Sequence, residues 1–116
     1  MILKGYYMKK KIVISLVVLI VLIVVLPYMV VECNTVFWGA NFENEYKQTN
    51  IISKIEYYKV FYCTGNKAKV YYVEEKHNSG NYIWFHKVNS KWEMEDWRTV
   101  WSKYGSASGI TYPIYK

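Results

Sequence analysis

The apolar positions of this chain form two patterns, a continuous run near the N-terminus and short alternating segments toward the C-terminus. Residues 12–31 carry no charge, and sixteen of these twenty residues are Ile, Val or Leu. Twenty helical residues rise roughly 30 Å, which matches the hydrocarbon core of a bilayer. A lone β-strand would leave its backbone polar groups unpaired in lipid, so the run predicts a transmembrane helix despite its many β-branched residues. Pro27 lies near the end of the run, where a kink or an early helix end is tolerated.

The alternating segments are rich in aromatic and β-branched residues and are separated by turn-forming Gly, Asn and Ser. Their spacing of about ten residues is typical of an antiparallel meander. The expected strands cover residues 56–63, 68–75, 82–88 and 92–97, with turns at 64–67, 77–81 and 89–91. Residues 98–101 either extend the fourth strand or open a fifth. Residues 110–115 are expected to form a terminal edge strand, because Pro113 cannot donate a hydrogen bond to a central ladder.

Residues 32–54 form a juxtamembrane segment in which the pattern fits a short helix. Its apolar stripe consists of Phe42, Tyr46 and either Ile52 or Ile55. Asn41 is the expected N-cap of this helix. Alternatively, residues 51–63 run as one long strand. The predicted fold is therefore one N-terminal transmembrane helix followed by a small α+β or mainly β domain, a four- to five-stranded antiparallel meander with a short preceding helix.

Two of the expected strands are apolar on both faces. In residues 56–63 and 82–88, aromatic or β-branched side chains occupy both the odd-numbered and the even-numbered positions, which point to opposite faces of a strand. The fourth strand is two-faced instead, with Trp92 and Met94 opposing two glutamates. A helix, a partner or the membrane surface must therefore cover the second face of the sheet.

Charged residues give the helix an orientation. Lys4 and Lys9 to Lys11 precede the apolar run, and the first eleven residues contain no acidic side chain. By the positive-inside rule, residues 1–11 are a cytoplasmic flank and the chain beyond residue 31 is exported from the cytoplasm. The run is long for a signal-peptide core and no small-residue cleavage site follows it, so we expect an uncleaved signal anchor in the cell membrane. Glu32 directly before Cys33 also argues against a lipid on that cysteine.

The net charge of +6 is distributed unevenly along the chain. Four of the fifteen basic residues belong to the N-terminal flank, which leaves eleven against nine acidic residues beyond residue 31. These charges are interspersed rather than gathered in a basic stripe, so nucleic acid is not an expected partner. The exported part suffices for one small domain, in which residues 55–116 form the antiparallel β domain. The bias toward Ile, Lys, Asn and Tyr suggests a bacterial source.

Cys33 and Cys63 are the only cysteines in the sequence. Outside the cytoplasm a disulfide between them is chemically allowed and would close a loop of about 30 residues, worth roughly 3 kcal/mol in the chain-entropy model. The alternative is two unpaired thiols. The sequence has no C-x-x-C motif, so neither redox nor zinc chemistry is indicated.

Aromatic residues are the main candidates for binding. Nineteen residues beyond the apolar run are Phe, Trp or Tyr, which is more than one small core is expected to hide. Exposed aromatic side chains stack on sugars and anchor protein interfaces, whereas in a small sheet with few aliphatic residues they also serve as core. The candidate binding face comprises Trp84, Trp92, Trp97, Trp101 and Tyr104.

No motif in the sequence indicates catalysis or metal binding. Residues 105–109 approach the G-x-S-x-G pattern of a nucleophile elbow, but their middle residue is Ala107. His77 and His86 are the only histidines, whereas a metal site normally needs three or four ligands. We therefore predict no catalytic residue, no metal and no cofactor.

These patterns together predict a small membrane-anchored protein whose exported β domain is a non-enzymatic binding or accessory module at the outer membrane surface. Besides the lipid bilayer, the expected partner is a membrane or cell-envelope protein or a cell-wall glycan. The alternative is a small regulatory or protective subunit that acts through its transmembrane helix on a membrane protein.

Overall fold

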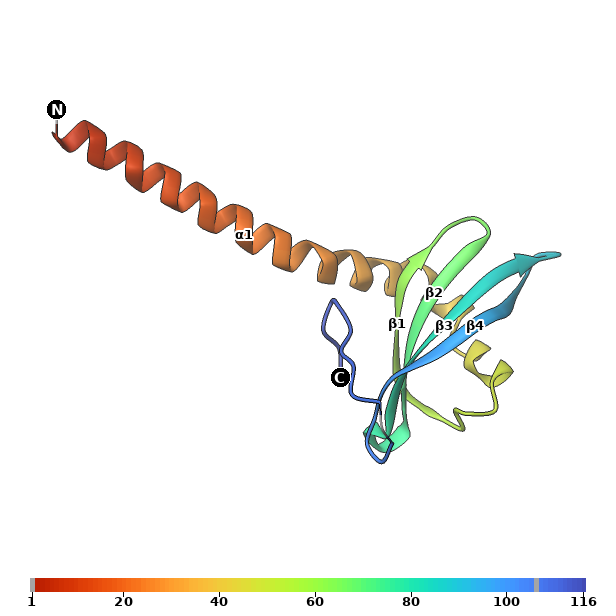
Figure 1. The fold of residues 1–116 in the computed structure, drawn as a ribbon. Helices are drawn as coiled ribbons and strands as arrows, with labels where there is room; N and C mark the ends of the chain where they lie inside the picture. The colour runs from red at the N-terminus through yellow and green to blue at the C-terminus, as the bar shows by residue number, and fades with distance from the viewer. Residues whose placement is uncertain (1, 106) are drawn as a thin grey trace.

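The computed structural model describes residues 2–105 and 107–116, in which a long helix leads into a four-stranded sheet (Figure 1). Helix α1 spans Ile2–Trp38, and a stretch of 18 residues within it has a mean hydropathy of 3.1 and contains no buried residue. This helix is long and apolar enough to cross a membrane, which agrees with the prediction from the apolar run.

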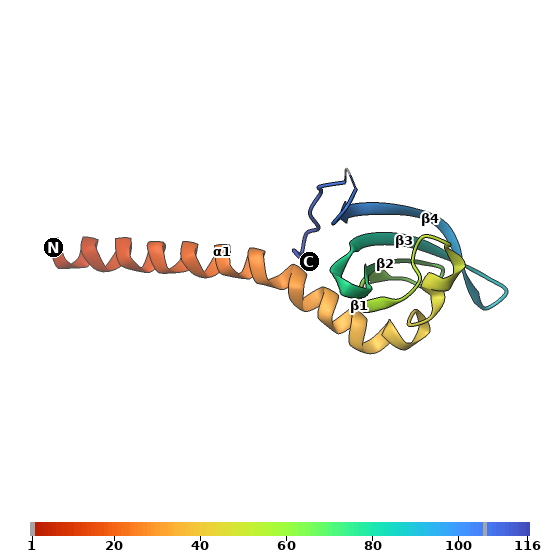
Figure 2. The ribbon, with the colours of Figure 1, turned by 90° about the horizontal axis from the view of Figure 1, so that it is seen from below.

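Helix α1 continues past the apolar run instead of ending near it. It ends at Trp38, seven residues beyond Val31. Pro27 lies inside the helix, where it removes one backbone hydrogen bond without ending the helix. Figure 2 shows the axis bending in the orange part of the helix, before the last turns run beside the sheet. Bends of this kind commonly occur at proline.

The four strands form an antiparallel meander in the order β1-β2-β3-β4, which confirms the predicted fold class. They are β1 Ile55–Cys63, β2 Lys67–Glu74, β3 Ser79–Val88 and β4 Lys91–Ser102. Strand β4 includes residues 98–101, so these residues extend the fourth strand and do not open a fifth.

Strand β3 begins at Ser79, three residues earlier than predicted. The polar residues at its start interrupt the apolar alternation, and the pattern of the sequence therefore predicts a loop there. In the structure their side chains form hydrogen bonds with one another and with neighbouring polar side chains. Ser79 Oγ donates to Glu74 Oε2 at 2.8 Å, Asn81 Nδ2 donates to Ser79 Oγ at 2.9 Å, and Thr99 Oγ1 donates to Asn81 Oδ1 at 2.7 Å. Polar side chains that find such partners are compatible with a buried strand.

Residues 110–115 do not form the predicted terminal edge strand, and the sheet of the described residues has four strands. The Thr111 hydroxyl instead holds this segment in a tight turn. Its Oγ1 donates to the Pro113 carbonyl oxygen at 2.7 Å and accepts from the Tyr115 amide at 2.9 Å. The segment therefore forms a local turn in place of ladder pairing, and near the end of β4 the chain keeps one isolated bridge, between Trp101 and Ser108.

The juxtamembrane segment forms two short 3-10 helices rather than the predicted α-helix or a long strand. They are η1 Gly39–Asn41 and η2 Glu45–Gln48. Asn41 ends η1 and therefore does not cap a helix as predicted. The apolar positions of the expected stripe are nevertheless buried, since Phe42, Tyr46 and Ile52 all face the protein interior.

This segment covers one face of the sheet and builds the larger of two cores. The buried members of the larger core are Phe42, Tyr46, Ile52, Val60, Ala68, Val70, Tyr72, Ile83 and Phe85. The Tyr72 hydroxyl donates to the Phe42 carbonyl oxygen at 2.6 Å, so a hydrogen bond as well as apolar packing fixes the segment on β2.

The opposite face of the sheet holds the smaller core, whose buried members are Tyr71, Val73, Val100 and Trp101. A β-bulge in β1 changes which side chains reach this face. Val60 lies opposite Val70, but after the bulge Tyr62 lies opposite Lys69. Tyr62 therefore shares a face with Lys69 and not with Val60, contrary to simple alternation. Tyr115 of the C-terminal segment packs on this second face, so both faces of the sheet are covered.

Candidate functional site

The last turns of α1 lie along the outer edge of β1 and form two hydrogen bonds with the backbone of that strand. Asn34 Nδ2 donates to the Phe61 carbonyl oxygen at 3.2 Å, and the Val60 amide donates to Thr35 Oγ1 at 2.8 Å. Val31, one turn earlier, is buried. An edge strand otherwise presents unpaired backbone groups. Specific bonds, rather than a flexible linker, therefore join the helix to the sheet.

Replacing Thr35 with valine should lower the free energy of unfolding by about 1–3 kcal/mol, because the Val60 amide loses its acceptor while the side-chain shape is kept. Thr35→Ser keeps the hydroxyl and is the matched control, expected to stay close to the parent protein. Urea unfolding of the full chain in detergent micelles, followed by tryptophan fluorescence, measures both changes. Equal destabilisation by the two variants would contradict the role of the hydroxyl.

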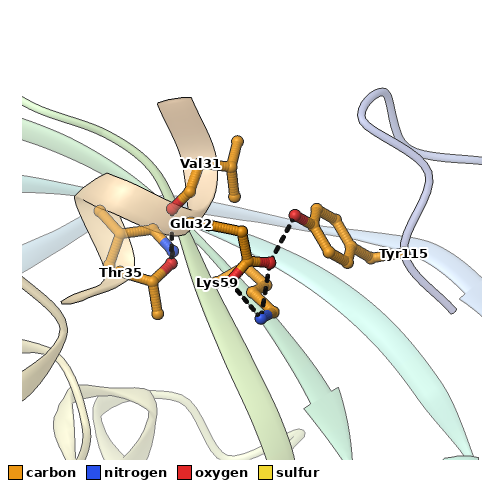
Figure 3. A network of polar contacts seen from close by, with 6 residues as sticks. Val31, Glu32, Thr35, Lys59 and Tyr115 are labelled. Carbon is orange, nitrogen blue, oxygen red and sulfur yellow. Dashed lines mark hydrogen bonds and ion pairs between the residues drawn. The ribbon is translucent and has the colours of Figure 1, made fainter. Parts of the chain in front are cut away.

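Glu32 joins three elements just beyond the apolar run (Figure 3). Its Oε1 and Oε2 lie 2.8 Å and 3.0 Å from Lys59 Nζ on β1, and Oε1 accepts a hydrogen bond from the Tyr115 hydroxyl at 2.8 Å. Burial and the hydrogen bond to Glu32 raise the pKa of Tyr115 above its ordinary value, so its phenol stays protonated and donates. The carboxylate is about half exposed. Because exposed ion pairs contribute little stability, this network mainly fixes the relative positions of the three elements.

The C-terminal segment is held against both the sheet and the helix. The Tyr71 hydroxyl donates to the Tyr115 carbonyl oxygen at 2.8 Å, and the Ile114 amide donates to the Tyr28 hydroxyl at 2.8 Å. The Tyr28 ring lies 5.7 Å from the Tyr115 ring and 6.3 Å from the Tyr112 ring. Tyr28 belongs to the apolar run, so the C-terminal segment lies beside the end of that run (Figure 1).

Lys69 lies at the centre of an aromatic patch on the second face of the sheet, which we define as Phe61, Lys69, Tyr82 and Trp84. Lys69 Nζ is 3.9 Å from the centre of the Tyr82 ring, 5.4 Å from that of Trp84 and 5.6 Å from that of Phe61. Burial lowers the pKa of Lys69, and the nearby charge of Arg98 lowers it further. The four side chains are only half-buried, so the patch presents aromatic rings and a cation to a ligand.

An apolar cavity of about 460 Å³ lies between the helix, the bulge of β1 and the C-terminal segment. We call it the helix groove. Ile23 and Val30 line it from the helix, Phe61 and Lys69 from the aromatic patch, and Tyr112 from the C-terminal segment. Its volume lies within the range of roughly 300–1,000 Å³ that is usual for small-molecule sites.

A second cavity, of about 480 Å³, lies beside η3, Glu75–His77, and the loop that follows β4. The His77 ring lies 5.0 Å from the Trp101 ring, and His77 Nδ1 is 3.2 Å from Glu56 Oε2. Ser106, within the loop that approached a nucleophile elbow in sequence, lies outside the described residues. Among the described residues, no cluster of three or more His, Cys, Asp or Glu is placed to hold a metal ion.

The five aromatic residues predicted to form one binding face are spread over both faces of the sheet and the loop after it. Trp84 belongs to the aromatic patch, whereas Trp92 packs against the larger core. Trp101 is buried in the smaller core. Trp97 and Tyr104 are exposed, at 42% and 84%. These side chains do not make one continuous surface, because alternation along the strands sends neighbouring positions to opposite faces.

Cys33 and Cys63 are not joined in the structure. Cys33 is exposed on α1, and Cys63 is partly buried at the end of β1. Burial raises the pKa of the Cys63 thiol above its ordinary value. The disulfide that the sequence allows is therefore not formed in this structure.

Sequence reasoning did not single out Glu32, Lys69 or Tyr115, which organise this region. Two of them have a feature in the sequence that could have identified them. Glu32 is the first charged residue after the apolar run, and Lys69 is a cation that shares a strand face with Tyr71. Tyr115 has no such feature, because its bond to Glu32 joins residues 83 positions apart in the chain.

Comparisons with known proteins add no relative to this description. No protein-family model matches the chain, and neither a curated protein nor a solved structure is similar enough to count as a match. What the chain does is therefore inferred from its own geometry.

Proposed function

We propose that this protein is a single-pass anchored binding module, with its N-terminus in the cytoplasm and its β domain on the outer surface of the cell membrane. The observation that carries the proposal is the continuity of α1, which runs without interruption from the apolar run into contact with β1. A domain fixed in this way is held directly at the membrane surface, and its aromatic patch has a defined position relative to the bilayer.

The aromatic patch supports a binding role rather than a catalytic one. Half-buried Tyr82 and Trp84 offer ring faces that stack on sugars or protein side chains, and Lys69 adds a cation between them. The partner that fits this chemistry is a cell-envelope protein or a cell-wall glycan that reaches the membrane surface. Trp84 is the residue that we expect to contact it, because aromatic anchors dominate such interfaces.

Photo-crosslinking tests this proposal. A benzophenone amino acid placed at Trp84 of the full chain should give a discrete crosslinked product in intact cells after irradiation. The matched control carries the same group at Asn50, which is exposed on the segment that covers the opposite face of the sheet. Identical products from both positions, or none from Trp84, would overturn the assignment of the aromatic patch.

Thiol labelling tests the orientation. Cys33 is exposed just beyond the apolar run, so a membrane-impermeant maleimide should label it in intact cells. Cys63 should react more slowly, because its raised pKa leaves less thiolate at neutral pH. A cysteine placed at Lys9 in a chain lacking both native cysteines should react only after permeabilisation. Labelling at Lys9 but not at Cys33 in intact cells would reverse the proposed topology.

A role exerted through the helix is the second candidate, and the composition of the run favours it less. Ser15 is the only residue among Gly, Ala, Ser and Thr in residues 12–31, whereas transmembrane helix partners usually pack through several of these small residues. Exchanging residues 12–22 for a leucine run, with residues 23–38 kept, separates the two roles. The crosslinked product from Trp84 should persist in this chimera, and its loss would favour the helix as the acting element.

A further inference from the structure

We propose that the helix groove binds one acyl chain of a membrane phospholipid whose anionic headgroup lies at Lys69. The inference rests on the proposed placement of the protein in the membrane and names a ligand for the groove that Phe61 and Lys69 of the aromatic patch help to line. The ligand comes from the bilayer that the helix itself enters, so no soluble supply is needed.

The C-terminal segment lies at the depth where the bilayer meets water. Its Ile114 amide donates to the Tyr28 hydroxyl at 2.8 Å, and Tyr28 precedes the end of the apolar run by three residues, about 5 Å along the helix. The segment also exposes large apolar side chains there, with Ile110 at 69%, Tyr112 at 57% and Ile114 at 53%. Such side chains beside a membrane helix are stable when they contact lipid, and tyrosine is favoured at this level.

The groove opens onto the lipid-facing surface of the helix. Ile23 and Val30, which line it, are exposed at 60% and 53%. The residues that precede them along α1 form a continuous exposed apolar surface from Ile12 onward. An acyl chain that lies against this surface can therefore pass into the groove without crossing water. The apolar surface that the helix presents to lipid thus extends through the groove into the β domain.

The charge that lines the groove suits an anionic headgroup. Lys69 lines the groove and forms no ion pair among the described residues, and Arg98 is close enough to perturb it. Glu32, at the same junction, is already engaged by Lys59 and Tyr115. The Asp96 carboxylate is likewise engaged, because it accepts a hydrogen bond from the amide of the neighbouring Trp97. A phosphate at Lys69 would gain a charge-assisted hydrogen bond, which is stronger than a neutral one.

Native mass spectrometry of the full chain tests the proposal. The protein is reconstituted in vesicles of equal phosphatidylcholine and phosphatidylglycerol, extracted in mild detergent and analysed for retained lipid. We expect one phosphatidylglycerol per chain, enriched at least tenfold over phosphatidylcholine. Val30→Trp fills the groove and should abolish retention. Val25→Trp, five residues earlier and roughly 140° round the helix, is the matched control and should retain the lipid.

Lys69→Gln distinguishes the contribution of the headgroup from that of the acyl chain. This variant should keep one lipid per chain but lose the preference for phosphatidylglycerol, whereas Lys47→Gln, exposed on η2, should keep the preference. Lack of retained lipid in the parent chain, or equal retention by Val30→Trp, would overturn the acyl-chain site. An unchanged preference in Lys69→Gln would overturn the headgroup assignment. The Trp84 crosslink and the Cys33 label are independent of these outcomes, so the proposed function can stand or fall separately.

Discussion

Replacing Phe42 with alanine should lower the free energy of unfolding by about 3–5 kcal/mol, close to the whole stability of a small domain. Phe42 is fully buried, and its ring lies 5.3 Å from the Phe85 ring and 5.1 Å from the Trp92 ring. It belongs to a segment without regular α-helix, whose place on the sheet depends on such side chains. Truncating Phe42 therefore leaves a cavity and also weakens the cover of the larger core.

Phe37→Ala is the control for this change. Phe37 lies five residues earlier and is exposed at 77%, so its truncation should change the unfolding free energy by less than about 0.5 kcal/mol. Urea unfolding of both variants in detergent micelles, followed by tryptophan fluorescence, gives the comparison. A loss under about 1 kcal/mol for Phe42→Ala would mean that residues 39–52 do not cover the sheet as described.

Gly80→Ala should cost about 3 kcal/mol, although it adds only one methyl group. A Cβ at Gly80 would overlap the Trp101 indole nitrogen and the Tyr71 hydroxyl. These two groups are joined by a buried hydrogen bond of 2.6 Å in the smaller core. Accommodating the methyl group must therefore displace the Trp101 ring and lengthen or break that bond. The same unfolding experiment measures the loss.

Gly65→Ala provides the matched comparison, because no heavy atom lies within 4 Å of a Cβ at that position. Its unfolding free energy should stay within about 0.5 kcal/mol of the parent. Near-ultraviolet circular dichroism should change for Gly80→Ala alone, since only that variant moves a buried tryptophan. Equal stability of the two glycine variants would show that Trp101 does not pack over β3.

The local sequence patterns predicted the helix and the strands, because these elements depend on composition and on the spacing of apolar residues along the chain. The apolar run predicted a membrane-spanning helix because lipid leaves a single strand unpaired. Alternation and turn residues predicted four strands in a meander, because a period of two matches the pleat of a sheet. The stripe of Phe42, Tyr46 and Ile52 predicted burial correctly, although the backbone there is not the expected helix.

The predictions that were wrong concern residues whose conformation depends on side-chain hydrogen bonds rather than on the hydrophobic period. The sequence pattern predicts a loop at the start of β3, because the bonds that satisfy Ser79 and Asn81 come from Glu74 and Thr99 and have no hydrophobic signature. The pattern also predicts an edge strand at residues 110–115, because the hydrogen bonds of Thr111 to its own segment leave no trace in hydrophobic alternation. Residue type predicts five aromatic candidates for binding, and strand geometry distributes them over both faces of the sheet, so their role in binding stays a prediction.

The sequence by itself determined that this protein has an apolar helix long enough to cross a membrane, and that a small antiparallel sheet follows it. Those features depend on neighbouring residues, and their periods can be read along the chain. Only the tertiary structure decided that α1 continues to Trp38 and forms hydrogen bonds along the edge of β1. It also decided that the C-terminal segment returns to Tyr28 and that Lys69 lies among aromatic rings beside a groove. These arrangements join residues far apart in the chain, where bond geometry and packing, rather than local pattern, select the partners.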